Sequence, residues 1–119
     1  MSVGVVTVVQ TVRLYDVAHS RAGDKGNTVN ISLIPFDADA YPYLLEQVTE
    51  ARVMELFAHR SASAVKRYEV PGLPALNFVI EDALEGGVNQ SLNLDGHGKA
   101  LSFLLLTMEV EVPGRFVRN

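Results

Sequence analysis

The stretch Ala18-His19-Ser20-Arg21-Ala22-Gly23-Asp24-Lys25-Gly26-Asn27 is denser in charged and hydrogen-bonding groups than any other segment, and Asn30 lies just beyond it. Apolar residues alternate with polar ones on both sides, over residues 11–18 and 28–36, as they do in half-buried strands. Glycine adopts backbone conformations that other residues avoid, so the stretch suits a connection between two strands. The sequence therefore predicts a long β-hairpin whose tip is this glycine-containing loop.

Helical and extended patterns follow in turn. Apolar residues spaced three and four apart predict a helix over residues 41–59, bent at Thr49, which can cap a second helical piece. A short strand is predicted over residues 65–70, and Pro71-Gly72 ends it as a turn.

Residues 74–84 fit two patterns. The apolar positions 76, 78 and 80 alternate as in a strand, whereas a helical spacing covers a longer span, with Pro74 before it and Gly86 after it. Because the helical pattern is the longer one, we predict a helix over residues 74–84.

The rest of the chain completes a single domain. We predict a strand over residues 88–94, a turn over 95–98, a helix over 100–108, an extended piece around Val110 and a loose tail over 113–119. The valine-rich start, residues 1–11, is predicted as a strand extension. It is an internal strand that continues into the next one or a partly ordered tail, and the alternative is that it pairs with the edge of another subunit. This order predicts one domain over residues 1–119, of class α+β: a ferredoxin-like sandwich, mostly antiparallel sheet with helices on one face.

Length and composition limit the chemistry. A chain of 119 residues buries a core without cross-links, and the absence of cysteine excludes disulfides, iron–sulfur clusters and thiol catalysis. The net charge of −4 and the scattered Lys and Arg residues argue against a nucleic-acid partner. The apolar start is too short for a membrane span, so no membrane partner is expected. A cytoplasmic location fits this cysteine usage.

The glycine-containing stretch is predicted to bind an anion. Its backbone N–H groups would converge on one concavity, where Arg21 and Lys25 attract a carboxylate or phosphate and Asp24 orients the two cations. The alternative is an ordinary solvated turn, but a connection of about ten residues is typical of binding loops. The predicted ligand-binding residues are Ser20, Arg21, Gly23, Asp24, Lys25, Gly26, Asn27 and Asn30.

His19 is the candidate general base. Histidine commonly serves as a general base, and Asp16 or Asp24 would orient it here, so His19 and Asp24 are the candidate catalytic residues. The alternative is that His19 only forms hydrogen bonds. His59 and His97 share no ligand spacing with His19. We therefore expect no metal site and no bound cofactor.

A family resemblance rests on an ordered set of short motifs. After the stretch at 18–27 come Asn30-Ile31, Tyr41-Pro42, Phe57-Ala58-His59, Val65 to Pro71, Ala75 to Phe78, Leu84 to Val88, Ser91-Leu92 and Gly98 to Leu101. In this order the chain resembles the AtuA-like ferredoxin-fold domain over about residues 12 to 110. That domain forms the C-terminal part of acyclic terpene utilisation proteins and also occurs as a small separate protein. The chain departs from the pattern at Asn27, where Asp is also common, and lacks the large N-terminal region of the fused proteins.

The resemblance implies an accessory role. It suggests a small subunit that acts with a larger AtuA-type protein in the catabolism of branched or terpenoid-like acids or their CoA thioesters. The residues that match the family's motif are Arg21, Gly23, Asp24, Lys25, Gly26 and Asn30. Two alternatives remain open: a self-sufficient small hydratase or isomerase that uses His19 and Asp24 at an oligomer interface, and a non-catalytic oligomeric scaffold domain.

Overall fold

The computed structural model describes residues 8–25, 28–58, 62–82 and 101–117. Its strands and helices are β1 (Val9–Arg13), β2 (Ala18–Lys25), β3 (Thr28–Pro35), α1 (Tyr41–Gln47), α2 (Glu50–Phe57), β4 (Ala64–Glu69), β5 (Leu76–Glu81), a helix over 101–106, and β6 (Glu109–Pro113). Short 3-10 turns lie at Leu14–Asp16, Ala38–Ala40 and Gly114–Phe116.

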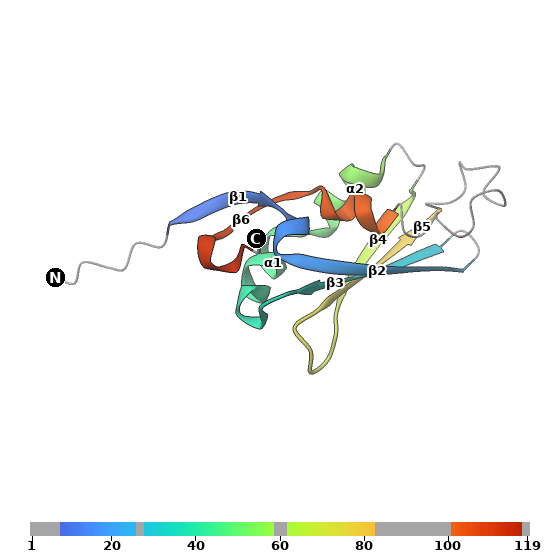
Figure 1. Ribbon diagram of the computed structural model, residues 1–119. Coiled ribbons are helices and arrows are strands. Elements are labelled where there is room, and N and C mark those ends of the chain that lie inside the picture. Colours follow the sequence, from blue (N-terminus) through green and yellow to red (C-terminus); the bar gives the residue numbers. More distant parts are fainter. Residues whose placement is uncertain (1–7, 26–27, 59–61, 83–100, 118–119) are drawn as a thin grey trace.

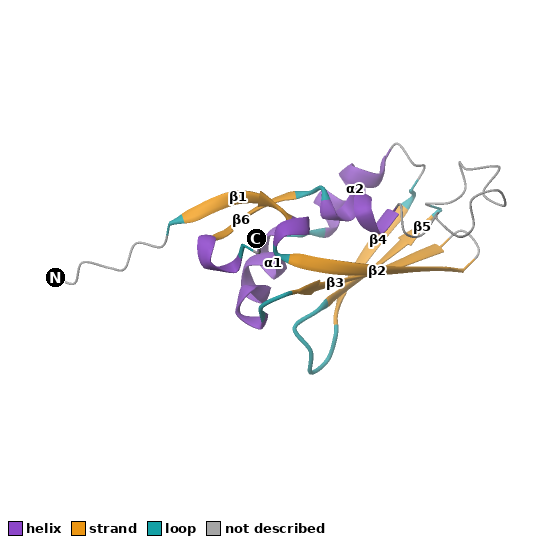
Figure 2. Cartoon of the chain, in the orientation of Figure 1, coloured by secondary structure: helices purple, strands orange, loops and turns teal. Residues whose placement is uncertain are grey.

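Strands β2 to β5 form one antiparallel sheet in the order β2-β3-β5-β4 (Figure 1). The chain passes from β3 through α1 and α2 to β4, and β5 lies between β3 and β4, which makes this part a split β-α-β unit. Figure 2 shows the helices on one side of this sheet. The predicted α+β, ferredoxin-like architecture is therefore confirmed, with β2 as the edge strand beside β3.

Alternation along the central strands decides which face of the sheet is buried. In β3, Val29, Ile31 and Leu33 are fully buried, and their partners in β5 are Ile80, Phe78 and Leu76. Each such side chain contributes about 2 kcal/mol when removed from water. The helical side chains that complete the core are Leu44, Val53, Phe57, Leu101 and Leu105.

The opposite face of the sheet is polar. The strand register aligns Arg21, Ser32, Asn77 and Tyr68 in one row across all four strands. The Ser32 hydroxyl donates to Asn77 Oδ1 at 3.5 Å, and Asn77 Nδ2 donates to Asn30 Oδ1 at 3.5 Å. The row is exposed at both ends, where Arg21 and Tyr68 lie.

Strands β1 and β6 form a separate antiparallel ribbon (Figure 1). The predicted single strand over residues 11–18 is wrong, because the 3-10 turn at Leu14–Asp16 interrupts it and starts β2 in a different sheet. The Leu14 side chain is fully buried, and its N–H donates to the Met108 carbonyl at 2.8 Å. These two contacts hold the turn against the end of the helix over residues 101–106, the C-terminal helix.

The helix predicted over 41–59 is broken at the residue expected to bend it. α1 ends at Gln47, and the Thr49 hydroxyl accepts the Arg52 N–H at 3.2 Å as the N-cap of α2. Threonine favours this position because its oxygen satisfies an N–H that has no partner within the helix. The strand predicted over 65–70 is confirmed as β4.

Three other expectations are wrong. Residues 74–84 do not form a helix: β5 occupies Leu76–Glu81, because pairing with both β3 and β4 favours the extended form. The central stretch is not a loop, since residues 18–25 are strand β2. The C-terminal tail is not loose up to residue 117, because Gly114–Phe116 forms a turn that buries Phe116. The elements predicted over 88–100, the start at 1–7 and residues 118–119 lie outside the described residues.

Candidate functional site

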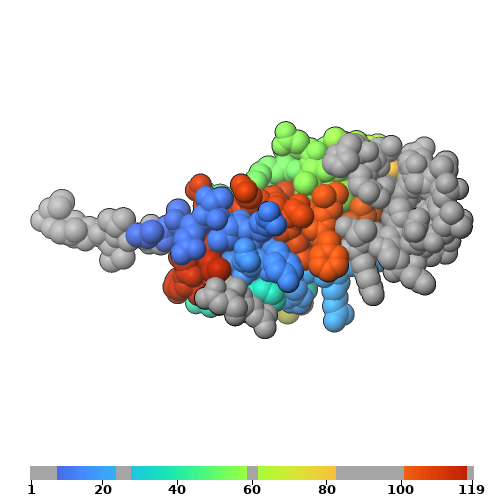
Figure 3. Space-filling view, turned by 45° about the horizontal axis from the view of Figure 1, so that its top comes forward, coloured from blue at the N-terminus to red at the C-terminus, as the bar shows by residue number. Residues whose placement is uncertain are grey.

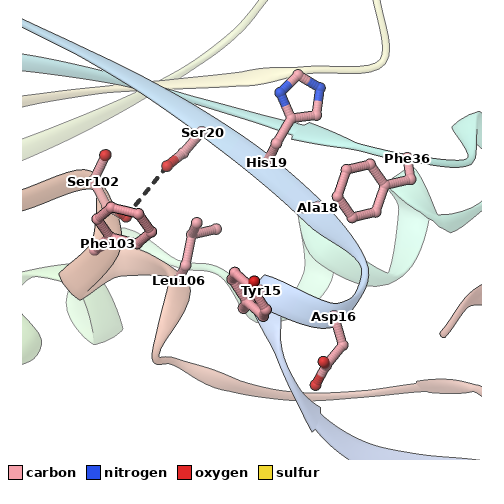
Figure 4. Close-up of a pocket in the computed structure, with 9 residues that line it drawn as sticks. All are labelled: Tyr15, Asp16, Ala18, His19, Ser20, Phe36, Ser102, Phe103 and Leu106. Carbon is pink, nitrogen blue, oxygen red and sulfur yellow. Dashed lines mark hydrogen bonds between the residues drawn. The ribbon is translucent and has the colours of Figure 1, made fainter. Parts of the chain in front are cut away.

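A pocket of about 470 Å³ lies beside the start of β2. One wall comes from β2 and the 3-10 turn before it, and the other from the helix over 101–106. Figure 3 shows these blue and orange parts of the chain side by side on one surface. The residues that line the pocket are Tyr15, Asp16, Ala18, His19, Ser20, Phe36, Ser102, Phe103 and Leu106 (Figure 4).

The walls of the pocket are mainly apolar and aromatic. Three of the aromatic side chains are exposed although they are large: Tyr15 by 62%, Phe103 by 59% and Phe36 by 40%. Exposed aromatic side chains that gather around one cavity indicate a surface that contacts a ligand or a partner. Leu106 lies at the base of this group and is almost completely buried.

Ser20 has a structural partner in the pocket wall. Its hydroxyl donates to the Ser102 carbonyl at 3.2 Å (Figure 4) and so links β2 to the C-terminal helix. This bond uses the only proton that the hydroxyl can donate. We therefore assign Ser20 to holding the two walls together.

His19 stacks on an aromatic ring. Its ring centroid lies 5.6 Å from that of Phe36 with an interplanar angle of 16°. In Figure 4 the imidazole and the Asp16 carboxylate point away from each other. Asp16 instead accepts the Arg13 N–H at 3.3 Å. Asp16 is therefore placed to hold the 3-10 turn and not to orient His19.

His19 and Asp24, the two candidate catalytic residues, lie far apart along the same strand. The two residues lie five positions apart on β2, opposite Ile34 and Val29 of β3. At about 3.4 Å per residue along an extended strand, their Cα atoms are about 17 Å apart. The two residues cannot therefore share one proton-transfer step within a single chain.

The predicted anion-binding residues lie along the β2–β3 hairpin. Along β2 the backbone is paired with β3 from Ala18 to Lys25, so its N–H groups alternate in direction and do not converge on one concavity. Arg21, Gly23 and Asn30 share the polar face, with Gly23 directly opposite Asn30. Gly26 and Asn27 lie outside the described residues, as do the side chains of Asp24 and Lys25.

Arg21 is close to the pocket along the strand. It lies two positions after His19 on the same face of β2, a spacing of about 7 Å between Cα atoms. Arg21 is exposed and makes no hydrogen bond or ion pair with any other described side chain. His19 and Arg21 thus form a polar margin beside an apolar cavity.

The site contains aromatic residues that the sequence patterns did not indicate. Tyr15 and Phe36 flank β2 and β3 at positions that strand periodicity leaves unexplained. Phe103 is exposed on a helix whose other face is buried in the core. The sequence signal that could have indicated these pocket residues is an aromatic residue next to the end of a predicted strand. Within the described ranges, no group of His, Asp and Glu is arranged to hold a metal ion, and no helix has the length and apolar composition needed to cross a membrane.

Comparison with protein families finds a match that covers most of the chain. The description "AtuA ferredoxin-like domain" fits residues 12–111, which is most of the chain. The chain belongs to the AtuA ferredoxin-like domain family. The match spans both the pocket and the β2–β3 hairpin, so the site lies within the matched domain. Comparison with curated proteins and with solved structures finds no significant match.

Proposed function

We propose that this AtuA ferredoxin-like domain is an accessory subunit that binds a branched or terpenoid-like acid, or its CoA thioester, together with a larger AtuA-type protein. The observation that carries the proposal is the apolar pocket with a polar margin. Tyr15, Phe36 and Phe103 offer contact area to a branched hydrocarbon chain, and Arg21 offers a charge to an anionic group.

The pocket has apolar walls and a polar margin, which match the two parts of an amphipathic acid. The aromatic walls exclude water from an alkyl group, and each methylene that leaves water contributes about 0.8 kcal/mol. His19 and Arg21 lie on one face at the edge of these walls, where the carboxylate, or the phosphates of a CoA thioester, would lie in solvent reach. A neutral alcohol with the same hydrocarbon chain would bind through the walls alone.

The catalytic groups come from a larger partner protein. The Ser20 hydroxyl is bonded to Ser102, and His19 is stacked on Phe36 and far from Asp24. Among the described residues we find no nucleophile paired with a base, which is the usual arrangement of a self-contained catalytic site. The chain therefore contributes binding groups, and the reacting groups come from the larger protein.

Binding of a terpenoid acid tests the pocket. We expect citronellic acid to bind more tightly than citronellol in a calorimetric titration of the chain. Phe103→Ala weakens both ligands about tenfold because the apolar wall is lost, whereas Arg21→Gln weakens only the acid, also about tenfold, because the charge is lost. Leu73→Ala and Lys66→Gln are matched controls, since both residues are exposed elsewhere on the molecule. Equal affinity for acid and alcohol, or equal effects of Phe103→Ala and Leu73→Ala, would contradict this assignment.

Association with a larger protein tests the accessory role. We expect the chain to co-purify from native extract with an AtuA-type protein, and the two purified proteins to bind at micromolar concentration. Turnover of a terpenoid acyl-CoA should require both proteins. Elution of the chain alone, together with turnover by the chain alone that His19→Ala abolishes, would favour the self-sufficient enzyme instead.

A further inference from the structure

The β1–β6 ribbon has one edge that is already occupied. On the outer edge of β6, the Glu111 N–H donates to Gln47 Oε1 at 2.7 Å, and Gln47 Nε2 donates to the Glu111 carbonyl at 2.7 Å. The Arg52 guanidinium donates to the Glu109 carbonyl at 2.7 Å. Side chains of α1 and α2 thus satisfy β6 as a neighbouring strand would, and no further strand can pair there.

The same contacts reveal the direction of the backbone groups of β1. Glu109 and Glu111 point their backbone groups away from β1, so the pairs Arg13 with Glu109 and Thr11 with Glu111 are the non-hydrogen-bonded pairs of the ribbon. Arg13 and Thr11, and Val9 two residues before Thr11, therefore direct their backbone N–H and C=O groups away from β6. Asp16 accepts the Arg13 N–H at 3.3 Å. Within the described part of the chain, the outward N–H groups of Val9 and Thr11 meet no acceptor.

The composition of β1 favours pairing with another strand. Val9 is 44% exposed, and Val8, just before it, is 75% exposed. Natural edge strands usually avoid association through a proline, an inward charge or a bulge, and β1 contains no proline and has a charge only at Arg13, its last residue. In the four-stranded sheet, the edge strand β4 has one of its outward N–H groups covered, because the Glu50 carboxylate accepts the Arg67 N–H at 2.8 Å.

We propose that two copies of this chain associate by antiparallel pairing of their β1 strands, which joins the two ribbons into one continuous sheet. Val9 pairs with Thr11 of the partner subunit and Thr11 with the partner's Val9, so that Gln10 faces Gln10 of the partner subunit on the two-fold axis. This register uses the outward groups of Val9 and Thr11 and forms about four backbone hydrogen bonds. It leaves the bond from Arg13 to Asp16 intact.

A second copy is the partner that fits this edge best. An antiparallel pair is two-fold symmetric, so the open edge of β1 in one copy is complementary to the same edge in a second copy. The residue on the axis is a neutral amide, and the two Arg13 side chains lie about 20 Å apart, beyond the range in which like charges repel strongly at physiological salt. No charged group therefore opposes its own copy.

Single-cysteine variants test this register, because the natural chain has no cysteine. Residues that face each other in a non-hydrogen-bonded pair have Cα atoms about 4.5 Å apart, within the range that a disulfide spans. We expect Gln10→Cys to form a covalent dimer under mild oxidation. Arg13→Cys, on the same edge but far from the axis, should keep a free thiol and form no covalent dimer. Failure of Gln10→Cys to cross-link, or equal cross-linking of Arg13→Cys, would overturn the proposal.

Light scattering with Thr11→Pro provides a second measurement that does not depend on a new cysteine. Proline removes the outward N–H of Thr11 but no bond to β6, because that N–H points away from the ribbon. We expect the natural chain to be a dimer and Thr11→Pro to weaken self-association at least tenfold, while its circular dichroism stays that of the natural chain. A natural chain that is monomeric throughout the micromolar range, or a folded Thr11→Pro variant that remains an equally tight dimer, would show that β1 does not pair with itself.

Discussion

Replacing Phe78 by alanine is expected to lower the free energy of unfolding by about 4 kcal/mol, one of the largest effects of any single substitution in this chain. Phe78 is fully buried in the middle of β5, between Ile31 of β3 and Arg67 of β4. Loss of its ring removes apolar contact and leaves a cavity that the two flanking strands cannot close without breaking their pairing. Urea unfolding followed by circular dichroism measures the change.

Val79 provides the matched control because it is the next residue on the same strand. It faces the polar side of the sheet and is half-buried, so Val79→Ala should cost only about 1 kcal/mol. A helix over residues 74–84 would reverse this order, since its apolar stripe contains position 79 and omits position 78. A larger cost for Val79→Ala than for Phe78→Ala would therefore contradict the strand.

The same segment shows how far the sequence alone could predict the fold. Residues 76–80 alternate in a pattern that fits a strand, and a helical spacing fits residues 74–84 over a longer span. Periodicity cannot separate the two, because the decision comes from partners far away in sequence: β3 on one side and β4 on the other. By contrast, β3 and the α1–α2 break were predicted, since alternation and the Thr49 cap act within a few residues.

The candidate site also depends on partners that are distant in the sequence, so only one of its walls could be indicated by a local pattern. The sequence singled out a stretch whose first residues, Ala18, His19 and Ser20, line the pocket. It could not show that this stretch is an edge strand, in which neighbouring side chains face opposite sides and the N–H groups do not converge. The opposite wall, formed by Ser102, Phe103 and Leu106, is more than eighty residues away in the chain, and only tertiary packing brings it to β2. The anion-binding roles of Arg21, Asp24 and Lys25 remain predictions.

Arg67→Met is expected to lower the free energy of unfolding by about 3 kcal/mol, because Arg67 replaces hydrogen bonds that the break between α1 and α2 removes. One nitrogen of its guanidinium donates to the Leu45 carbonyl at 2.7 Å and to the Val48 carbonyl at 2.8 Å. Both carbonyls lie at the end of α1, where no later helical N–H can reach them. Methionine keeps most of the hydrophobic stem and leaves these part-buried acceptors without a donor.

Lys66 provides the control that distinguishes the hydrogen bonds of Arg67 from a general effect of losing a positive charge. It precedes Arg67 on β4 but is exposed on the polar face, so Lys66→Met should change stability by less than about 0.5 kcal/mol. Arg67→Lys keeps the charge but has a shorter reach and a single nitrogen, and we expect it to recover less than half of the loss. Thermal unfolding of the three variants under one buffer condition compares them directly. An equally small loss of stability in Arg67→Met and Lys66→Met would contradict this role, because water would then be satisfying the α1 carbonyls. The break between α1 and α2 would in that case depend on the Thr49 cap and on the contacts of Gln47 and Arg52 with β6.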